Sequence, residues 1–267
     1  MEAIILAGGH PGPEDPLYPY TQGRPKALLD LAGKPMLQWV LDAINEAPSI
    51  TGLRIFGVDS DAHPWHIAKP AHFYPDQGSM LKNILRGLAE IGQQASPDEP
   101  VLLISGDVPT VTGEVLEWAA GNAERHPDMD VVYHVVERRV METRFPGAQR
   151  TYLRLKDVEV CGGDVNLVRV RAAQRDDDLW ERIIASRKSP LKQAALLGWR
   201  VLLGVLLRRY TLQEAARLAA QRMNLAGTVE LSPFAELAMD VDKPEHLELV
   251  RRDLSTRKLQ SQEQSAS

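Results

Sequence analysis

The sequence opens with Met1-Glu2-Ala3-Ile4-Ile5-Leu6-Ala7-Gly8-Gly9, a short apolar run that ends in paired glycines. Such a run is typical of a buried parallel strand that leads into a tight loop. Residues 10–25 contain five prolines and two further glycines, so a loop is expected to follow the strand. The first 25 residues therefore predict a strand whose carboxyl end opens onto a glycine-rich loop.

Strands and helices are expected to alternate as far as residue 136. Apolar residues at helical spacing predict helices over 35–44, 80–91 and 112–123, and continuous apolar runs predict strands over 53–58, 100–104 and 130–136. Residues 59–75 are expected to be a connection. This alternation predicts an α/β fold, a three-layer, doubly wound and mostly parallel sheet with helices on both faces.

The pattern changes after residue 137. Residues 138–150 are rich in arginine and are expected to be irregular, and two strands over 151–155 and 166–170 are expected around a Gly162-Gly163 turn. Helices are predicted over 178–186, 190–209 and 244–254, and strands over 229–231 and 236–241. Thr211 and Glu214 predict a capping box for a helix that ends near Met223. We expect a single domain over 1–254, with 138–235 as its variable helical and β-hairpin region, and a disordered tail over 255–267.

Composition narrows the class of protein. The chain has 267 residues, 44% of them apolar, and a net charge of −5, whereas a protein that coats nucleic acid normally shows a basic imbalance. The single cysteine, Cys161, and a start without a secretory signal predict a cytoplasmic protein. The apolar stretch 194–207 is shorter than the roughly 20 residues that span a bilayer, so we expect no transmembrane span. A core helix is expected there, with a helix on a membrane or partner surface as the alternative.

The first candidate site joins the glycine loop to Arg24-Pro25-Lys26. Paired glycines let the backbone approach a base or phosphate, and a lysine downstream is placed to neutralise phosphate charge. An ordinary strand-to-helix turn is the alternative explanation for Gly8 and Gly9.

Two acidic segments are the other candidates. In Ser105-Gly106-Asp107-Val108-Pro109, an acid just past a buried strand lies where open α/β sheets bind ligands, and its carboxylate suits Mg²⁺. In Met239-Asp240-Val241-Asp242-Lys243-Pro244-Glu245, strand alternation would place Asp240 and Asp242 on one side, where two carboxylates favour a cation. A turn or helix cap is the alternative for Asp107 and Asp242.

Taken together, these motifs resemble a known family. Residues 4–9 with Pro25-Lys26-Ala27-Leu28-Leu29 and Leu31-Ala32-Gly33-Lys34-Pro35-Met36 resemble the opening of the sugar-phosphate and molybdenum-cofactor nucleotidyltransferases. Residues 106–109 look like the central metal motif of that superfamily, and residues 240–247 look like its closing motif. The resemblance implies the Rossmann-like fold that these enzymes share with the A-type glycosyltransferases.

The resemblance also implies roles for individual residues. Lys26 and Asp107 would be catalytic, and Asp107 and Asp242 would hold Mg²⁺, with Asp240 as the alternative ligand. The nucleotide would be bound by Leu6, Ala7, Gly8, Gly9, Arg24, Gln77, Gly78, Ser79 and Asn83. Gly163 and Asp164 lie where relatives contact the acceptor, with a plain hairpin turn as the alternative. Arg144 and Arg150 belong to a basic set that is a further candidate for an anionic acceptor, with a solvated charged surface as the alternative.

The implied reaction is Mg²⁺-dependent transfer of a nucleoside monophosphate from a nucleoside triphosphate to a phosphorylated small molecule, with release of pyrophosphate. The resemblance favours CTP or GTP as the nucleotide, with no nucleic acid as partner, and a homo-oligomer is a possible assembly. The family usually continues its paired glycines into a further glycine and an arginine that grips the triphosphate. The loop 10–15 is longer here and carries Glu14 and Asp15, which are poor partners for phosphate unless a metal intervenes. A nucleotide-sugar glycosyltransferase and a non-catalytic nucleotide- or sugar-phosphate-binding protein are the alternatives.

Overall fold

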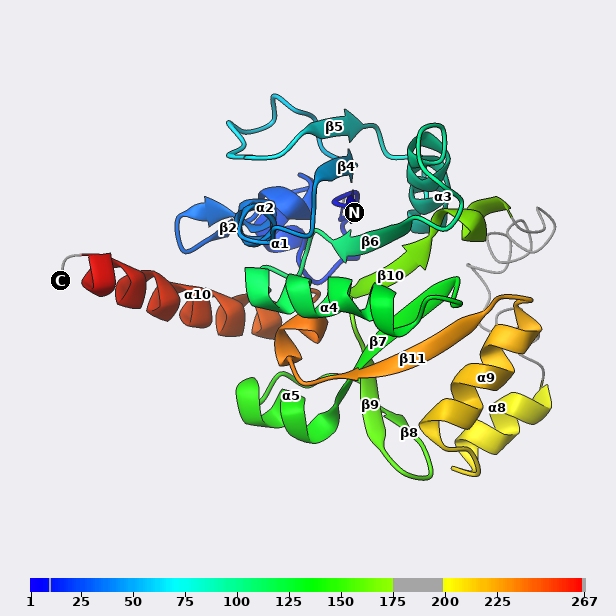
Figure 1. Cartoon of the computed structure of the whole chain (residues 1–267). Coiled ribbons are helices and arrows are strands. Elements are labelled where there is room, and N and C mark those ends of the chain that lie inside the picture. The colour runs from blue at the N-terminus through cyan, green and yellow to red at the C-terminus, as the bar shows by residue number, and fades with distance from the viewer. Residues whose placement is uncertain (10, 175–198, 266–267) are drawn as a thin grey trace.

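The fold is built on a large mixed sheet, and the computed structural model describes residues 1–9, 11–174 and 199–265 (Figure 1). The sheet has nine strands in the order β5-β4-β1-β6-β10-β7-β9-β8, with β11 paired to β7. The strands are β1 (Glu2–Leu6), β4 (Gly52–Phe56), β5 (Ala71–Tyr74), β6 (Pro100–Ser105), β7 (Val131–Glu137), β8 (Leu153–Arg154), β9 (Glu159–Gly162), β10 (Val165–Arg169) and β11 (Gly227–Ser232).

The strand directions place one set of carboxyl ends together. β1 pairs in parallel with β4 and with β6, and β4 pairs in parallel with β5. β10 is antiparallel to both β6 and β7, and β9 is antiparallel to β7 and to β8. β11 pairs in parallel with β7, so all strands of the sheet except β9 and β10 run in one direction, and β1 and β6 end side by side.

Helices cover both faces of the sheet. The longer ones are α2 (Met36–Asn45), α3 (Met80–Ile91), α4 (Gly113–Arg125), α9 (Leu212–Arg222) and α10 (Pro244–Ser265). The shorter segments are α1 (Tyr18–Thr21), α5 (Arg138–Arg144), α8 (Trp199–Leu206) and the 3-10 helices η1 (Lys26–Leu28), η2 (Val170–Gln174) and η3 (Ala235–Ala238). β2 (Asp30–Leu31) and β3 (Lys34–Pro35) form a separate hairpin before α2.

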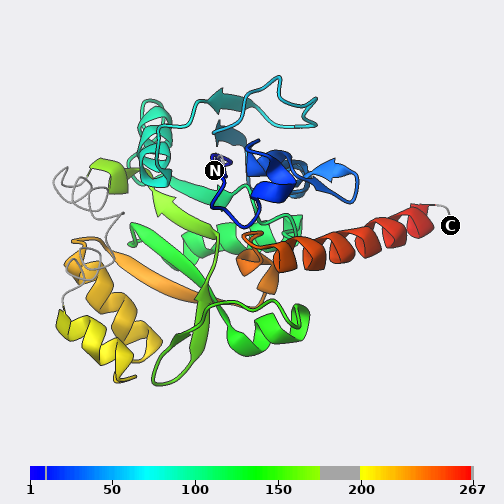
Figure 2. The same ribbon diagram turned by 180° about the vertical axis from the view of Figure 1, so that it is seen from behind.

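Alternation along β1 divides the core into two layers. Ala3 and Ile5 pack in the large apolar cluster that contains α2, α4 and the first turns of α10, whereas Ile4 packs with Phe56 and with α3 on the opposite face. A third cluster joins β7, β9 and β11 to α9. Figures 1 and 2 show α8 and α9 at the end of the molecule opposite the free end of α10.

The three-layer, mostly parallel fold is confirmed, and so is the capping box of α9, in which the Thr211 and Glu214 side chains bond reciprocally to each other's backbone N–H. No helix in the described part of the chain is long and apolar enough to cross a membrane. The predicted helix over 178–186 and the first residues of the one over 190–209 lie outside the described residues, and α8 follows at Trp199.

Four predictions were wrong. The connection 59–75 contains the edge strand β5, whose exposed His72 interrupts the apolar pattern expected of a strand. The segment 138–150 begins with helix α5, in which Arg138 and Glu142 pair one turn apart and Met141 supplies a single buried anchor. Residues 236–241 are not a strand, because η3 occupies Ala235–Ala238 and residues 239–241 belong to no strand.

The fourth error concerns the tail, because α10 continues to Ser265 instead of becoming disordered at Ser255. Contacts to other elements hold the extension in place. Arg257 donates a hydrogen bond to the carbonyl oxygen of Thr110, and Lys258 donates one to that of Ala32. This polar segment is therefore a solvated helix, and its charged side chains anchor it to other elements.

Candidate functional site

A cleft of about 470 Å³ opens where β1 and β6 end. Both strands are central to the sheet, so their carboxyl ends are held by neighbours on each side, and open α/β sheets bind ligands at such ends. The cleft is lined by Leu6, Ala7, Gly8, Gly9, Pro11, Gly12, Asp15, Lys26, Ala27, Asp76, Gly78, Ser79, Met80, Asn83, Ser105, Gly106 and Asp107.

The floor of the cleft is made of closely packed backbone. Gly57, just after β4, has φ +95°, and a Cβ there would come within 2.1 Å of the Gly8 Cα. A Cβ on Gly106 would come within 3.1 Å of the Ala7 Cα. Glycine at 57 is therefore required by both its conformation and its surroundings, and it keeps the loop after β1 flat against the sheet.

Lys26 stands at the edge of this floor. It is the first residue of η1, and its backbone N–H donates to the Gly9 carbonyl oxygen at 3.4 Å, which ties the loop to the lysine. Its Nζ lies 2.5 Å from an oxygen of Asp107 and 2.6 Å from an oxygen of Asp242. Although burial opposes its charge, the two carboxylates raise the pKa of Lys26 above its ordinary value.

Asp107 follows β6 directly and is held from two sides. The Ser105 hydroxyl donates to Asp107 Oδ1 at 2.6 Å, and the Val241 N–H donates to the Asp107 carbonyl oxygen at 3.0 Å. The second bond joins the segment that carries Asp240 and Asp242 to the end of β6, although the two are more than 130 residues apart in the chain. Ser105 is a site residue that sequence reasoning quoted but did not assign.

Asp240 and Asp242 do not have the same role. Asp240 is buried and forms an ion pair with Arg150, whereas the Asp242 side chain is 57% exposed and faces Lys26. Burial and a hydrogen bond to Asp242 raise the pKa of Asp240 to about 7. Burial also opposes ionisation of Asp242, but the hydrogen bond from Asp240 and the charge of Lys26 lower the pKa of Asp242 to about 2.

Asp164 adds a further acidic group beside these residues. It follows the Gly162-Gly163 turn, its N–H donates to the Leu237 carbonyl oxygen, and its own carbonyl oxygen accepts from the Ser105 N–H. Burial, with the nearby charges of Asp240 and Asp107, raises the pKa of Asp164 to about 8. These residues therefore form an acidic cluster next to Asp107, beside the cleft lining, in which one cation, Arg150, is already paired.

The opposite wall of the cleft is the turn between β5 and α3. Asp76 accepts hydrogen bonds from the Asn83 side chain at 2.9 Å and from the Gly78 N–H at 3.1 Å, while the Ser79 hydroxyl caps α3. Gly8 faces Asp76, because a Cβ on Gly8 would lie 3.3 Å from the Asp76 carboxyl carbon. Sequence reasoning missed Asp76, and the signal for it was its position just after β5, the strand that was not predicted.

Some predicted residues lie away from the cleft. Arg24 is exposed, donates a hydrogen bond to the Thr21 carbonyl oxygen and is not among the lining residues. Gln77 does not line the cleft either, because its side-chain amide donates to the Pro75 carbonyl oxygen. Arg144 pairs with Glu236 and Asp253 against α10, which places it in a structural ion-pair network.

The remaining predicted residues have clear places. Gly163 is packed against β7, since a Cβ there would lie 2.9 Å from the His134 carbonyl oxygen. Asp15 lines the cleft and accepts a hydrogen bond from the Leu17 N–H, so the atypical loop is closed by its own turn. Cys161 is buried and its thiol faces the Val136 carbonyl oxygen, as expected of a packing residue.

The cleft suits a divalent cation that arrives with a ligand. No group of three or more His, Cys, Asp or Glu side chains in the described ranges is arranged to hold a metal ion by itself. Asp107 and Asp242 do converge on one positive group, the ammonium of Lys26. Mg²⁺ is commonly held by one or two carboxylates together with substrate phosphates and water, and this donor set fits that pattern.

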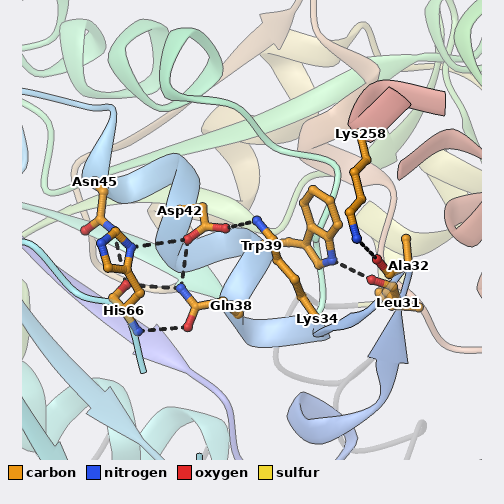
Figure 3. Close-up of polar contacts among 9 residues, drawn as sticks. All are labelled: Leu31, Ala32, Lys34, Gln38, Trp39, Asp42, Asn45, His66 and Lys258. Atoms are coloured by element: carbon orange, nitrogen blue, oxygen red, sulfur yellow. Dashed lines mark hydrogen bonds and ion pairs between the residues drawn. The ribbon is translucent and has the colours of Figure 1, made fainter. Parts of the chain in front are cut away.

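A second polar hollow lies beside α2 and shares no lining residue with the cleft. In Figure 3, Lys34 reaches Asp42, and the amide of Gln38 bonds to both Asp42 and the His66 backbone. The Lys34 ammonium also lies 4.5 Å from the centre of the Trp39 ring. Each of these polar side chains has a hydrogen-bond or ion-pair partner. The cluster therefore has a structural role, which is to hold α2 against residues 63–68.

Comparison with known proteins adds independent findings. The sequence profile of the MobA-like NTP transferase domain matches residues 3–225. The structure of a hypothetical transferase from Thermus thermophilus has 31% sequence identity and a TM-score of 0.77, and the match covers 92% of this chain and 98% of that one.

Two more distant solved structures share the fold. CMP:2-keto-3-deoxy-manno-octonic acid synthetase complexed with CTP has 14% identity and a TM-score of 0.58, over 96% of this chain and 100% of that one. The 4-diphosphocytidyl-2C-methyl-D-erythritol synthase from Anaerococcus prevotii DSM 20548 has 12% identity and a TM-score of 0.56, over 95% of each chain.

Proposed function

The chain belongs to the MobA-like NTP transferase family and is a nucleotidyltransferase, and from this premise we propose its reaction. It transfers a nucleoside monophosphate from a nucleoside triphosphate to a phosphorylated small molecule, in the presence of Mg²⁺, and releases pyrophosphate. The observation that carries the proposal is the convergence of Asp107 and Asp242 on Lys26 at the open end of β1 and β6.

The nucleotide occupies the cleft between the glycine loop and the turn before α3. Backbone groups of residues 6–9 lie against the base and ribose, and Gly78, Ser79 and Asn83 form the other side of the binding site. Asp76 holds Asn83 and the Gly78 N–H in place, so it positions the residues that read the base. CTP and GTP are the candidates, and CTP comes first because both distant structural neighbours carry a cytidine group in their names.

The triphosphate lies over Lys26. Asp107 and Asp242 would hold Mg²⁺, which when bound neutralises phosphate charge as the bond to pyrophosphate breaks. Lys26 then exchanges part of its ion pairing for the phosphate oxygens, and Ser105 keeps the Asp107 carboxylate oriented. Catalysis in this arrangement is positioning and charge neutralisation.

The acceptor enters beside Asp164 and Arg150. A phosphate monoester is already an anionic nucleophile, so attack on the α-phosphate needs no side chain that removes a proton. Arg150 is a cation beside this part of the site, and its ion pair with Asp240 orients it. Asp240 therefore acts as the partner of Arg150, and we assign the second metal-ligand position to Asp242.

The test is pyrophosphate release by the full chain, with Mg²⁺, each of the four triphosphates and pools of phosphorylated sugars and alcohols. We expect pyrophosphate release that needs Mg²⁺, a triphosphate and an acceptor. Release should be lost in Asp107→Asn and should persist in Asp42→Asn, the matched control, which lies in α2 outside the cleft. Nucleotide binding without release would show a binding protein instead. Release of a nucleoside diphosphate from a sugar nucleotide would show glycosyl transfer.

A further inference from the structure

An apolar groove of about 410 Å³ lies between α9 and the sheet strands β7, β9 and β11. Its volume is within the range of small-molecule sites, roughly 300–1,000 Å³. In Figure 1, α9 lies along β11, with α8 beside it and the β8–β9 hairpin nearby. The groove is distinct from the nucleotide cleft, with which it shares no lining residue.

The chemistry of the groove is uniform. None of the 17 described residues that line it carries a charge, and 13 of them are valine, leucine or alanine. Alanines at 215, 216, 219 and 220 form much of the α9 wall. Leu153 and Tyr133 on the rim are 48% and 45% exposed, so the groove is accessible from outside. A site of this kind favours a hydrocarbon group and disfavours a sugar or phosphate.

Tyr133 lies between the groove and the residues proposed to bind the acceptor. The ring of this residue lines the groove, and its hydroxyl covers Gly162, where an added Cβ would lie 2.3 Å from that oxygen. Gly162 is two residues from Asp164, whose charge contributes, after burial, to the raised pKa of Tyr133. Tyr133 thus has an apolar ring in the groove and a polar end toward the acceptor site, as tyrosines at apolar–polar boundaries often do.

We propose that the acceptor of this enzyme carries an aliphatic chain, which lies in the α9 groove while its phosphorylated head lies at Arg150 and Asp164. The position of the phosphorylated head group rests on the proposed function. The position of the aliphatic chain rests on the apolar lining of the groove and on the place of Tyr133 between the groove and the acceptor residues. Burial of one methylene group contributes up to about fourfold in affinity, so chain length is a sensitive probe.

The experiment uses alkyl phosphates from ethyl to decyl, and displacement of a fluorescent fatty-acid analogue measures their binding to the full protein. We expect affinity to rise about two- to fourfold per methylene until the groove is filled. Ala219→Phe should flatten this rise by filling the groove. Ala89→Phe, on the exposed face of α3, is the matched control and should bind as the wild type does.

Pyrophosphate release with the same compounds and CTP gives a second measurement. We expect kcat/KM to rise with chain length in the wild type and in Ala89→Phe, but not in Ala219→Phe. Affinity that does not depend on chain length, or that is unchanged by Ala219→Phe in a folded protein, overturns the groove proposal. Chain-length-dependent binding without release from any acceptor supports the groove as a site and overturns the proposed function instead.

Discussion

Lys26 and Lys34 are eight residues apart, and each forms a short ion pair with an aspartate, yet their surroundings differ. Lys34 meets one carboxylate, that of Asp42, which also accepts from Gln38 in a cluster where donors and acceptors are matched. Lys26 meets two carboxylates at the ends of the sheet, and Asp164 and Asp240 lie close by with raised pKa values. The cluster around Lys26 therefore has more acidic groups than cations.

The difference separates a structural ion pair from a binding site. Like charges held together are unfavourable unless a cation joins them, and this cost is tolerated where a ligand brings the cation. The α2 cluster leaves nothing for a ligand to complete. The cleft cluster, in contrast, would gain stability from the metal-bound triphosphate that we propose, and substitutions in the two places should therefore have different consequences.

The largest effect is expected from substituting the two lysines in parallel. Lys26→Met would remove the cation that we propose neutralises the triphosphate, and it should lower kcat/KM for pyrophosphate release by roughly 100- to 1,000-fold. Lys34→Met should leave kcat/KM within about twofold of the wild type. Equal losses in both variants would contradict the assignment of Lys26 to the reaction.

Gly57 is the next most sensitive position. Gly57→Ala places a Cβ against the Gly8 backbone at a positive φ, which should destabilise the fold by about 2–4 kcal/mol and weaken nucleotide binding. Gly121→Ala, on the exposed face of α4, meets no atom within 4 Å and should stabilise the protein by about 0.5–1 kcal/mol. Denaturant unfolding of both variants measures the difference, and a tolerated Gly57→Ala would show that the loop after β1 is not confined.

The acidic cluster should also produce a pH dependence. The pKa of Asp164 is raised from 3.8 to about 8, so the folded protein retains a proton that the unfolded chain releases. The stability from Asp164 is therefore complete below about pH 4 and is lost as the pH rises to about 8. Asp164→Asn should remove about 1 kcal/mol or more of this decline, seen as a flatter plot of Tm against pH without divalent cations. An unchanged slope would count against the burial of Asp164.

The smallest effect is expected in the α2 cluster. Asp42→Asn keeps the hydrogen bond with Gln38 but removes the charge opposite Lys34, a partly exposed pair. Such pairs contribute about 0.2–1 kcal/mol, so the free energy of unfolding should fall by no more than that, and less at high salt. A larger loss, or a loss of activity, would show that this cluster is coupled to the cleft.

Sequence patterns predicted the main residues of the site better than they predicted the residues that form hydrogen bonds or ion pairs with them. Asp107 could be found because it follows a recognisable strand, and Asp242 because it precedes a helix. Lys26 could be found from the Pro25-Lys26 motif at the end of the glycine loop. Asp76 was missed because β5 is a short edge strand with a polar residue inside it. The ion pair between Arg150 and Asp240 joins segments 90 residues apart, and local sequence patterns do not reveal such a contact.

The same reasoning explains the errors after residue 137. Charged side chains that pair with other elements look like solvated loop in the sequence, as in α5 and the part of α10 that follows Leu254. The 3-10 helix η3 stands where alternation suggested a strand, although the Asp242 side chain still reaches Lys26. Tertiary contacts, which the sequence shows only indirectly, decided each of these segments.

The most direct test of the account is Mn²⁺ binding, measured by electron paramagnetic resonance on the full chain with and without CTP or GTP. Mn²⁺ replaces Mg²⁺ as a spectroscopic probe that also prefers oxygen ligands. We predict tight binding that requires the triphosphate, is weakened at least about tenfold in Asp242→Asn and is unchanged in Asp42→Asn. Binding that ignores the triphosphate, or that survives Asp242→Asn intact, would contradict the claim that Asp107 and Asp242 form the metal–triphosphate site.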